Sequence, residues 1–331
     1  MLMGKFLVVC FIVVCVRITA QENLIMNGDC EEYSSCPLDY SAATQIPYEI
    51  TKCLGWHCPT VGTSDYLNRC NGDPLTVGVP INGHGVQEPF SGDGYLGAYV
   101  FNAAAGFGIS GNMWWEYVTC TLSEPLEDGK IYRFSFYLSL AEYSDLMIDE
   151  IGAYFSDTIP VSLTTNPLEI NPQIFFKATT YFGDTINWTY VEGNYVATGG
   201  EKYITIGNFK DTSETNFYRY KIRDYDTMKT YMYFDEFSLT QSEFSEVMPN
   251  VFTPNGDGIN DFIDFSVFKG REIYIMNRWG NTIYLFNKQS SYLWYGLDEL
   301  GNSLSDGVYY FIIIDPESEE NSFYGTIYLT Q

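Results

Sequence analysis

The stretch IYRFSFYLSL, residues 131–140, alternates large apolar side chains with smaller or polar ones. Apolar residues stand at every even position from Tyr132 to Leu140, while Arg133, Ser135 and Ser139 stand between them. Successive side chains of a β-strand point to opposite faces of a sheet. The stretch therefore predicts a strand with one buried face.

The same two-residue rhythm recurs towards the C-terminus, at Ile273 and Ile275 and again at Val308, Tyr310 and Ile312. Turn-forming sequences such as those at 127–129, 199–200, 256–258 and 300–302 separate the apolar runs. The chain holds 28 Tyr, 23 Phe and 29 Gly but only 18% charged residues, a composition that favours short aromatic strands and tight turns. We find no helical pattern of three turns and no internal repeat, and expect an all-β fold.

Residues 51–113 differ from the rest, being rich in Gly, Pro, Asn and Cys with few alternating runs. A compact domain rarely carries so long an irregular segment unless it is functional or covalently stapled. Both explanations stay open for this segment.

The first twenty residues have the features of a signal peptide. Lys5 supplies positive charge, residues 6–16 are continuously apolar, and Ala20 offers a small residue before a cut at Gln21. Cys10 and Cys15 each follow Val, where a lipoprotein signal needs a small residue, so we expect them to be discarded with the peptide. No later segment is apolar for the roughly 20 residues that a membrane helix needs.

Removing Lys5 and Arg17 changes the formal net charge from -25 to about -27, because residues 1–20 contain no acid. Such a field repels nucleic acid and anionic membranes, so neither is expected as a partner. A solubility role explains the charge, and attraction of calcium is a second explanation.

Six cysteines remain after cleavage, and their even number in an exported chain favours three disulfides. Zinc binding is the competing interpretation, but zinc sites prefer paired CxxC spacing, and His57 and His84 are the only histidines. Among the 15 possible pairings, we choose Cys36–Cys70, Cys53–Cys58 and Cys30–Cys120.

The last quarter of the chain carries several motifs in a fixed order: PNVFTPNGDGIND at 249–261, NRWG at 277–280, Trp294, DGVYY at 306–310 and Gly325. This order resembles the type B C-terminal sorting domain of type IX secretion cargo in Bacteroidota, also called the gliding motility-associated C-terminal domain. Tyr295 departs from the Asp or Asn more usual there. The resemblance implies a small immunoglobulin-like sandwich, export to the cell exterior, and the type IX machinery as partner.

A more diffuse set of motifs precedes it. Residues 23–31, NLIMNGDCE, resemble the first strand of secreted galactose-binding-like β-sandwiches, with Cys30 in place of an aromatic residue. Further matches follow in order at 55–56, 65–67, 79–80, 94–97, 115–118, Trp188, 203–209 and 233–239. The resemblance implies a jelly-roll domain of the carbohydrate-binding kind. We therefore expect a signal peptide at 1–20, the jelly roll at 21–242 and the sorting domain at 243–331.

The galactose-binding resemblance also implies a structural Ca²⁺ held by Glu31 and Asp235, since a hard cation wants several oxygens at one locus. The alternative is two solvated acids at strand ends. Another candidate is the loop with Asn255, Asp257, Asp261 and Asp264 as ligands, although Thr253 replaces the first acid of a calcium loop. We favour a tight turn that uses Asn and Gly for their backbone tolerance.

Aromatic residues are the strongest ligand-binding candidates, because sugar faces stack on aromatic rings. We select Trp56, Trp114, Trp115 and Tyr95, with core packing as the alternative. No nucleophile or metal-protease motif accompanies the histidines. The sequence thus predicts a non-enzymatic, secreted or surface-held binding protein, with extracellular polysaccharide as a candidate partner. A polysaccharide hydrolase using unidentified acids, or a structural surface component, are the alternatives.

Overall fold

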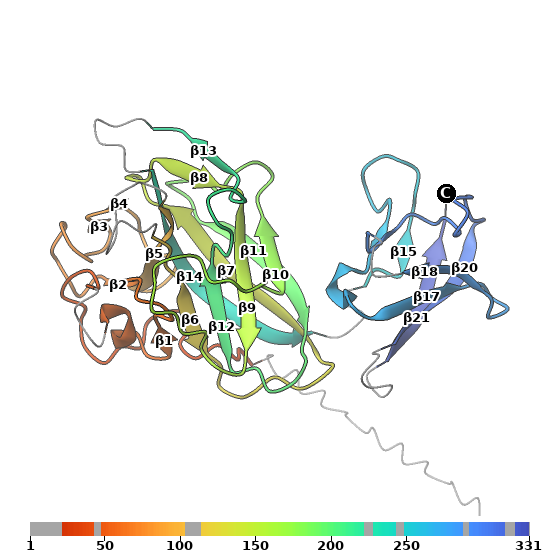
Figure 1. Cartoon of the computed structure of the whole chain (residues 1–331), viewed down its shortest axis with the longest axis horizontal. Coiled ribbons are helices and arrows are strands. Elements are labelled where there is room, and N and C mark those ends of the chain that lie inside the picture. The colour runs from red at the N-terminus through yellow and green to blue at the C-terminus, as the bar shows by residue number, and fades with distance from the viewer. Residues whose placement is uncertain are drawn as a thin grey trace, which may run out of the picture.

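A computed structural model describes residues 22–42, 48–102, 114–221, 228–242, 248–286, 291–314 and 322–330 (Figure 1). The predicted signal peptide therefore lies outside the described residues. Within the described residues the secondary structure is nearly all strand, with two single-turn helices, η1 (Glu49–Lys52) and η3 (Ser266–Phe268). The expected all-β class is confirmed, and no described helix has the length and apolarity to cross a membrane.

Two antiparallel sheets form the N-terminal sandwich. The first has the strand order β1 (Trp56–His57), β6 (Val118–Thr121), β12 (Tyr203–Gly207), β9 (Glu150–Ser156) and β10 (Ile174–Lys177). The second has the order β11 (Thr189–Val196), β7 (Ile131–Leu140), β14 (Lys229–Ser242), β5 (Gly94–Asn102) and β2 (Asp65–Asn68). Strands distant in sequence are neighbours in both sheets, as in a jelly roll. Two short two-stranded sheets accompany them: the hairpin of β3 (Ile81–Asn82) with β4 (Gly85–Val86), and the pair of β8 (Leu146–Ile148) with β13 (Phe217–Arg219).

Strand β7 has the burial that its alternation predicts. Phe134, Phe136 and Leu138 lie in the core between the sheets, whereas Arg133 and Tyr137 are half-buried on the opposite face. The partner strands continue this inner layer, because Phe136 pairs with Val191 of β11 and Leu138 with Phe234 of β14.

Strand β14 contains a bulge between Asp235 and Ser238, with Glu236 at φ 52°. The extra residue turns Phe237 into the core beside Trp56, with ring centroids 4.4 Å apart. The N-terminal segment closes over the bulge, since the Phe237 amide donates to the carbonyl of Gly28. Gly28 is required there, because a Cβ would lie 2.2 Å from the Phe237 carbonyl oxygen.

The C-terminal domain has a five-stranded sheet among its described residues, in the order β15 (Val251–Phe252), β21 (Phe323–Leu329), β20 (Gly307–Ile314), β17 (Glu272–Met276) and β18 (Thr282–Phe286). A short pair, β16 (Ile263–Asp264) and β19 (Leu293–Trp294), covers its inner face. Trp294 is the buried centre of this layer, and its indole donates to the Leu297 carbonyl at 2.9 Å.

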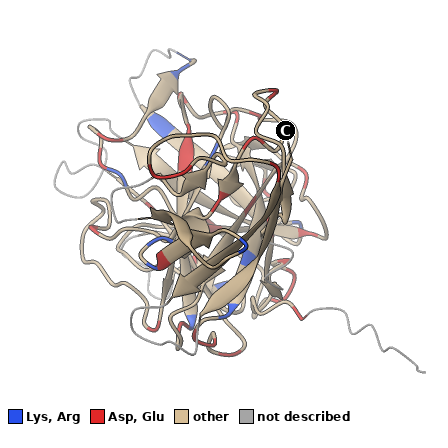
Figure 2. Ribbon diagram, turned by 90° about the vertical axis from the view of Figure 1, so that its right-hand side faces the viewer, with Lys and Arg blue, Asp and Glu red and all other residues tan. Residues whose placement is uncertain are grey.

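The two domains share no sheet but do share a buried cluster. Ile131 and Val196 of the sandwich belong to the same group of buried side chains as Met248 and Phe268. In the view of Figure 2, acidic residues occur at many separate places along the described ribbon. The excess of 42 acids over 17 bases therefore makes a diffuse negative surface.

Candidate functional site

Three of the four aromatic residues that the sequence proposes for ligand binding are buried: Trp56 and Trp115 lie between the two sheets, and Tyr95 lies in the cluster on the outer face of the second sheet. Trp56, Tyr95 and Trp115 are at most 1% exposed. The Trp56 indole donates to the Asn27 carbonyl, and the Trp115 ring packs edge-on against Phe101. Their rings belong to the core, as the alternative interpretation held, and offer no face to a ligand in this structure.

Trp114, the fourth aromatic candidate, is half-buried. Its indole donates to Oε1 of Glu116 at 2.7 Å, and the same oxygen accepts from the amide and hydroxyl of Thr63. The other oxygen of Glu116 accepts from the Tyr99 amide. This buried carboxylate is therefore committed to joining three chain segments.

The outer face of the second sheet carries an aromatic strip that the sequence analysis did not select. Phe90 stacks on Tyr137 of β7 with ring centroids 3.6 Å apart, and Tyr137 lies 5.1 Å from Tyr190 of β11. Phe90 is 45% exposed and Tyr190 is 47% exposed. We call these three residues the aromatic strip.

Polar groups extend the strip along the same face. Glu192 follows Tyr190 at the two-residue spacing of β11, and its carboxylate accepts from the Tyr190 hydroxyl at 2.9 Å. Asn194 follows in the same phase opposite Arg133, and its side-chain carbonyl oxygen is buried without a hydrogen-bond partner. At the other end, the Trp188 indole donates to the Glu88 carbonyl.

The rest of this sheet face is covered by residues 69–93, the part of the irregular segment that connects β2 to β5 (Figure 1). Val77 and Val79 pack there against Tyr95, Tyr231 and Tyr233. The covered tyrosines are hydrogen-bonded beneath the segment: the Tyr231 hydroxyl donates to Asp65 at 2.8 Å and that of Tyr233 to Asn82 at 2.9 Å. The long irregular segment thus closes half of the face and leaves the aromatic strip open.

Burial controls the titration of this covered cluster. Burial lowers the pKa of His84 to about 3, and the Lys229 ammonium adds to the effect. The neutral imidazole stacks on Tyr231 with centroids 3.8 Å apart. Burial also raises the pKa of Asp65, with the Glu116 carboxylate contributing. Burial thus disfavours the charged forms of both His84 and Asp65 in this cluster.

Glu31 and Asp235, the calcium candidates, bind a common turn without converging on a cation site. Glu31 accepts from the amides of Asp93 and Gly94, and Asp235 accepts from those of Phe90, Ser91 and Glu236. No group of three or more His, Cys, Asp or Glu side chains suited to a metal occurs in the described part of the chain. Both carboxylates accept hydrogen bonds from backbone amides of residues 90–94, and these bonds fix the turn that presents Phe90.

The acids and Asn255 of the second calcium candidate, the loop that begins at Asn255, accept hydrogen bonds from nearby backbone amides. Asp261 accepts from the amides of Gly256 and Gly258, Asn255 from that of Asp257, and Asp257 from that of Ile259. Asp264 accepts from the amide of Ser266, outside this loop. The loop is the tight turn that we favoured, with Gly256 and Gly258 at positive φ.

One of the three predicted disulfides is confirmed by the structure. Cys36 and Cys70 form a disulfide. The pairs Cys53–Cys58 and Cys30–Cys120 are not formed, and these four residues are free thiols. The sulfur of Cys58 instead contacts the Gly62 carbonyl, and that of Cys120 faces the Ile204 carbonyl across the sheet.

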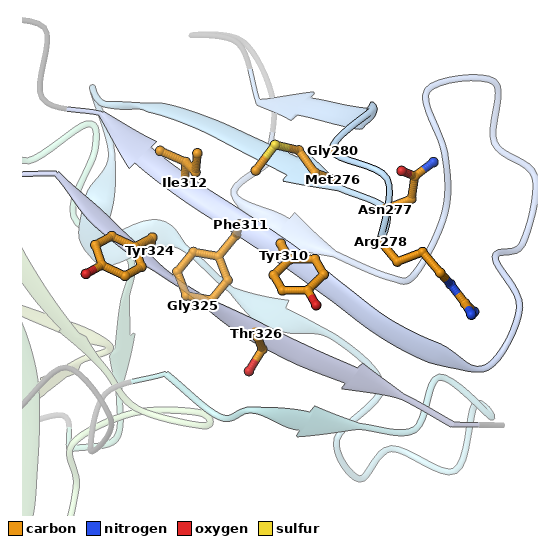
Figure 3. A pocket seen from close by; sticks show the side chains of 10 residues that line it. All are labelled: Met276, Asn277, Arg278, Gly280, Tyr310, Phe311, Ile312, Tyr324, Gly325 and Thr326. Atoms are coloured by element: carbon orange, nitrogen blue, oxygen red, sulfur yellow. The ribbon is translucent and has the colours of Figure 1, made fainter.

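A concave apolar surface, which encloses a volume of about 520 Å³, lies on the outer face of the C-terminal sheet (Figure 3). Cross-strand pairing sets Met276, Tyr310 and Thr326 in one row and places Ile312 beside Tyr324 in the next. We call this surface the C-terminal groove. Tyr324 is 81% exposed, so the groove presents a large uncovered aromatic ring to solvent.

Residues 246–329 match the family model of the CHU_C type IX secretion signal domain. Residues 246–329 thus carry a type IX secretion signal, which implies export to the cell surface or the medium. No curated protein matches the chain.

Solved structures supply only remote likenesses. The chain is 11% identical to the CBM22-1 xylan-binding domain of Paenibacillus barcinonensis Xyn10C, covering 63% of this chain and 97% of that one at a TM-score of 0.31. The K1 cleaved adhesin domain of Lys-gingipain from Porphyromonas gingivalis is 13% identical, with 62% and 98% covered and a TM-score of 0.31. PorZ, a surface component of the type IX secretion system of the same organism, is 19% identical, with 29% and 14% covered and a TM-score of 0.21.

Proposed function

We propose that the protein is a non-enzymatic glycan-binding protein of the cell exterior, and that its N-terminal sandwich binds saccharides on the aromatic strip. The observation that carries this proposal is the arrangement of Phe90, Tyr137 and Tyr190 as an open row of contacting rings. Apolar C–H faces of a sugar ring pack on such rings, while neighbouring polar groups fix its orientation. Glu192, which is exposed on the same face beside Tyr190, supplies such a polar group.

The strip is held before any ligand arrives. Tyr137 and Tyr190 are directly paired on adjacent strands. Phe90 is held in place by two hydrogen bonds, which the backbone amides of Phe90 and Ser91 donate to the Asp235 carboxylate. A site whose rings are already in place loses little conformational entropy on binding. This favours recognition of a saccharide by shape.

Binding without catalysis is part of the proposal. Asp65 and Glu116, two of the acids buried in the sandwich, are at most 3% exposed and hydrogen-bonded to protein groups. Glycoside hydrolysis needs two carboxyl groups that face the scissile bond. These two buried acids do not face solvent, so they do not supply such a pair.

A glycan array with the exported full-length protein tests this function, followed by titration of the strongest hit. Tyr190→Ala and Phe90→Ala should each weaken binding by about two- to tenfold, from the roughly 0.5–1.5 kcal/mol that an aromatic contact contributes. Tyr218→Ala is the matched control, because Tyr218 is an equally exposed tyrosine on β13, away from the strip. Absence of any saccharide ligand, or equal loss in all three variants, would reject the proposal in favour of a structural surface component.

We also propose that the C-terminal groove is the surface of the secretion signal that the export machinery contacts. Its apolar residues face solvent on the outer side of the sheet, opposite the side that packs on Trp294. An uncovered apolar surface on a soluble domain commonly marks an interaction site.

A further inference from the structure

Two of the four free thiols lie against each other inside the sandwich. Cys30 and Cys53 are both fully buried, and both contact Asn27: the Asn27 carbonyl accepts from the Cys30 amide at 3.1 Å, and the Asn27 side chain reaches the sulfur of Cys53. The two side chains are close enough for Cys53 to raise the pKa of the Cys30 thiol. The two residues come from different segments of the irregular N-terminal part of the chain. Neither Cys58 nor Cys120 has such a neighbour: their sulfurs face the backbone carbonyls of Gly62 and Ile204.

The backbone around the two thiols is fixed by a short antiparallel contact. The Ser34 amide donates to the Lys52 carbonyl and the Leu54 amide to the Glu32 carbonyl, both at 2.9 Å. Tyr33 and Cys53 form an isolated bridge within this contact. In addition, the Asn27 side chain donates to the sulfur of Cys53 at 3.2 Å and to the Leu54 carbonyl at 3.0 Å. The proximity of the sulfurs is thus a consequence of local main-chain pairing.

We propose that the exported protein carries a second disulfide, between Cys30 and Cys53, and that Cys58 and Cys120 remain thiols. The secretion signal at residues 246–329 takes the chain through the cell envelope, where thiols in contact are oxidised. Formation joins the two sulfurs, and each thiol gives up one proton and one electron. A protein disulfide of the envelope accepts the two electrons and is reduced to two thiols.

The bond must form while the sandwich is still open. Burial raises the pKa of Cys30, and the adjacent Cys53 adds to the effect, so the folded protein disfavours the attacking thiolate. An oxidant added after folding should therefore act slowly on this pair, whereas the same oxidant present during refolding should join it.

The second bridge would interlock with the first. In the sequence Cys36 lies between Cys30 and Cys53, and Cys53 lies between Cys36 and Cys70, so the two closed loops overlap. Overlapping loops tie together the segments on both sides of β1. They would restrain the irregular part of the chain, which has few strands of its own.

Peptide mapping of the exported full-length protein tests the proposal. The protein is denatured without reductant, alkylated, and cut after Asp and Glu, which separates Cys30 and Cys36 from each other and from the peptide 50–65. We expect a species that links Cys30 to the peptide 50–65, with fragmentation placing the bond at Cys53, and alkylation at Cys58 and Cys120. Reduction should add about four hydrogens to the intact mass, two per bridge.

Alkylation of both Cys30 and Cys53, or a bond from either of them to Cys58 or Cys120, would overturn the proposal. Variants give a second measurement. Cys30→Ser, Cys53→Ser and the double variant should show the same fall in Tm under oxidising conditions, because each removes the one bond. Cys58→Ser is the control and should leave the Cys30–Cys53 link in the peptide map. Additive losses from the two single variants would show that the residues act separately.

Discussion

At the scale of the residue, Asp235 shows how a carboxylate that resembles a metal ligand can be used to position a loop. It is fully buried, and three backbone amides point at its two oxygens. Burial nevertheless raises the pKa of Asp235 to about 8, although the hydrogen bonds from the backbone amides act to lower it. The turn that presents Phe90 therefore depends on a group that titrates near neutrality.

The stability of the protein should consequently fall as pH rises from about 4 to 8. Asp235 has a higher pKa in the folded than in the unfolded state, so its contribution is fully present below the unfolded value of about 3.9 and is lost as pH approaches the folded value. Asp235→Asn should flatten the dependence of Tm on pH relative to the wild type, as measured by thermal unfolding across this range. Asp65 adds a slope of the same sign in both proteins, because burial also raises its pKa.

Asp157→Asn is the control for this measurement, because Asp157 is exposed at the end of β9. It should retain the wild-type slope. Parallel curves for Asp235→Asn and the wild type would show that Asp235 is ionised across the whole range in the folded state.

The candidate site could be predicted from the sequence only in part, for reasons visible in single residues. Tyr137 stands in the polar phase of β7, between Ser135 and Ser139, so its outward direction was detectable. Phe90 lies in the irregular segment, and no local pattern indicates that it stacks on Tyr137. The tryptophans were misleading because residue type does not reveal direction: Trp56 faces inward because it pairs with Cys120 of β6.

At the scale of the element, alternation predicts strands well and their orientation less well. In β7 one phase is apolar and the other mixed, so the buried face follows from the sequence. In β20 both phases are apolar. Tyr309, Phe311 and Ile313 face the core, whereas Tyr310 and Ile312 line the C-terminal groove. Only the covering layer around Trp294 decides which phase is buried.

The bulge in β14 depends on the close approach of the N-terminal segment, and Gly28→Ala tests this. The added methyl group would meet the Phe237 carbonyl at 2.2 Å, and the backbone there cannot move without breaking the Phe237 to Gly28 hydrogen bond. We expect a loss of about 1–3 kcal/mol in the free energy of unfolding. Gly72→Ala is the matched control, since nothing lies within 4 Å of the position that its added methyl group would occupy. Equal unfolding curves for the two variants would contradict this account of the bulge.

At the scale of the whole molecule, a sandwich whose aromatic strip faces solvent is joined to a domain whose recognised role is export. The match to the secretion signal is confined to residues 246–329, and the two domains have separate sheets. Export and ligand binding should therefore respond to different substitutions.

Tyr324→Asp in the full-length protein should reduce the exported fraction by about tenfold, because placing a carboxylate in an apolar contact costs more than about 1.4 kcal/mol. The measurement is the ratio of protein outside the cell to protein retained in the periplasm. Leu300→Asp changes an equally exposed residue of the same domain outside the groove and should export normally. Normal export of Tyr324→Asp would show that the machinery contacts another surface, and glycan binding should be unaffected in both variants.

The central position of β14 has a mechanical consequence. This strand runs between β7 and β5 and ends next to the C-terminal domain, while the aromatic strip lies on β7 and β11. Suppose that the protein is attached to a cell through its C-terminal domain while its sandwich holds a polymer. A pull on the polymer would then place tension along β14 and across the hydrogen bonds that pair β14 with β7. Such a load acts on many hydrogen bonds of the β14–β7 pair at the same time. The sandwich would therefore resist this force better than one that separates an edge strand one hydrogen bond at a time.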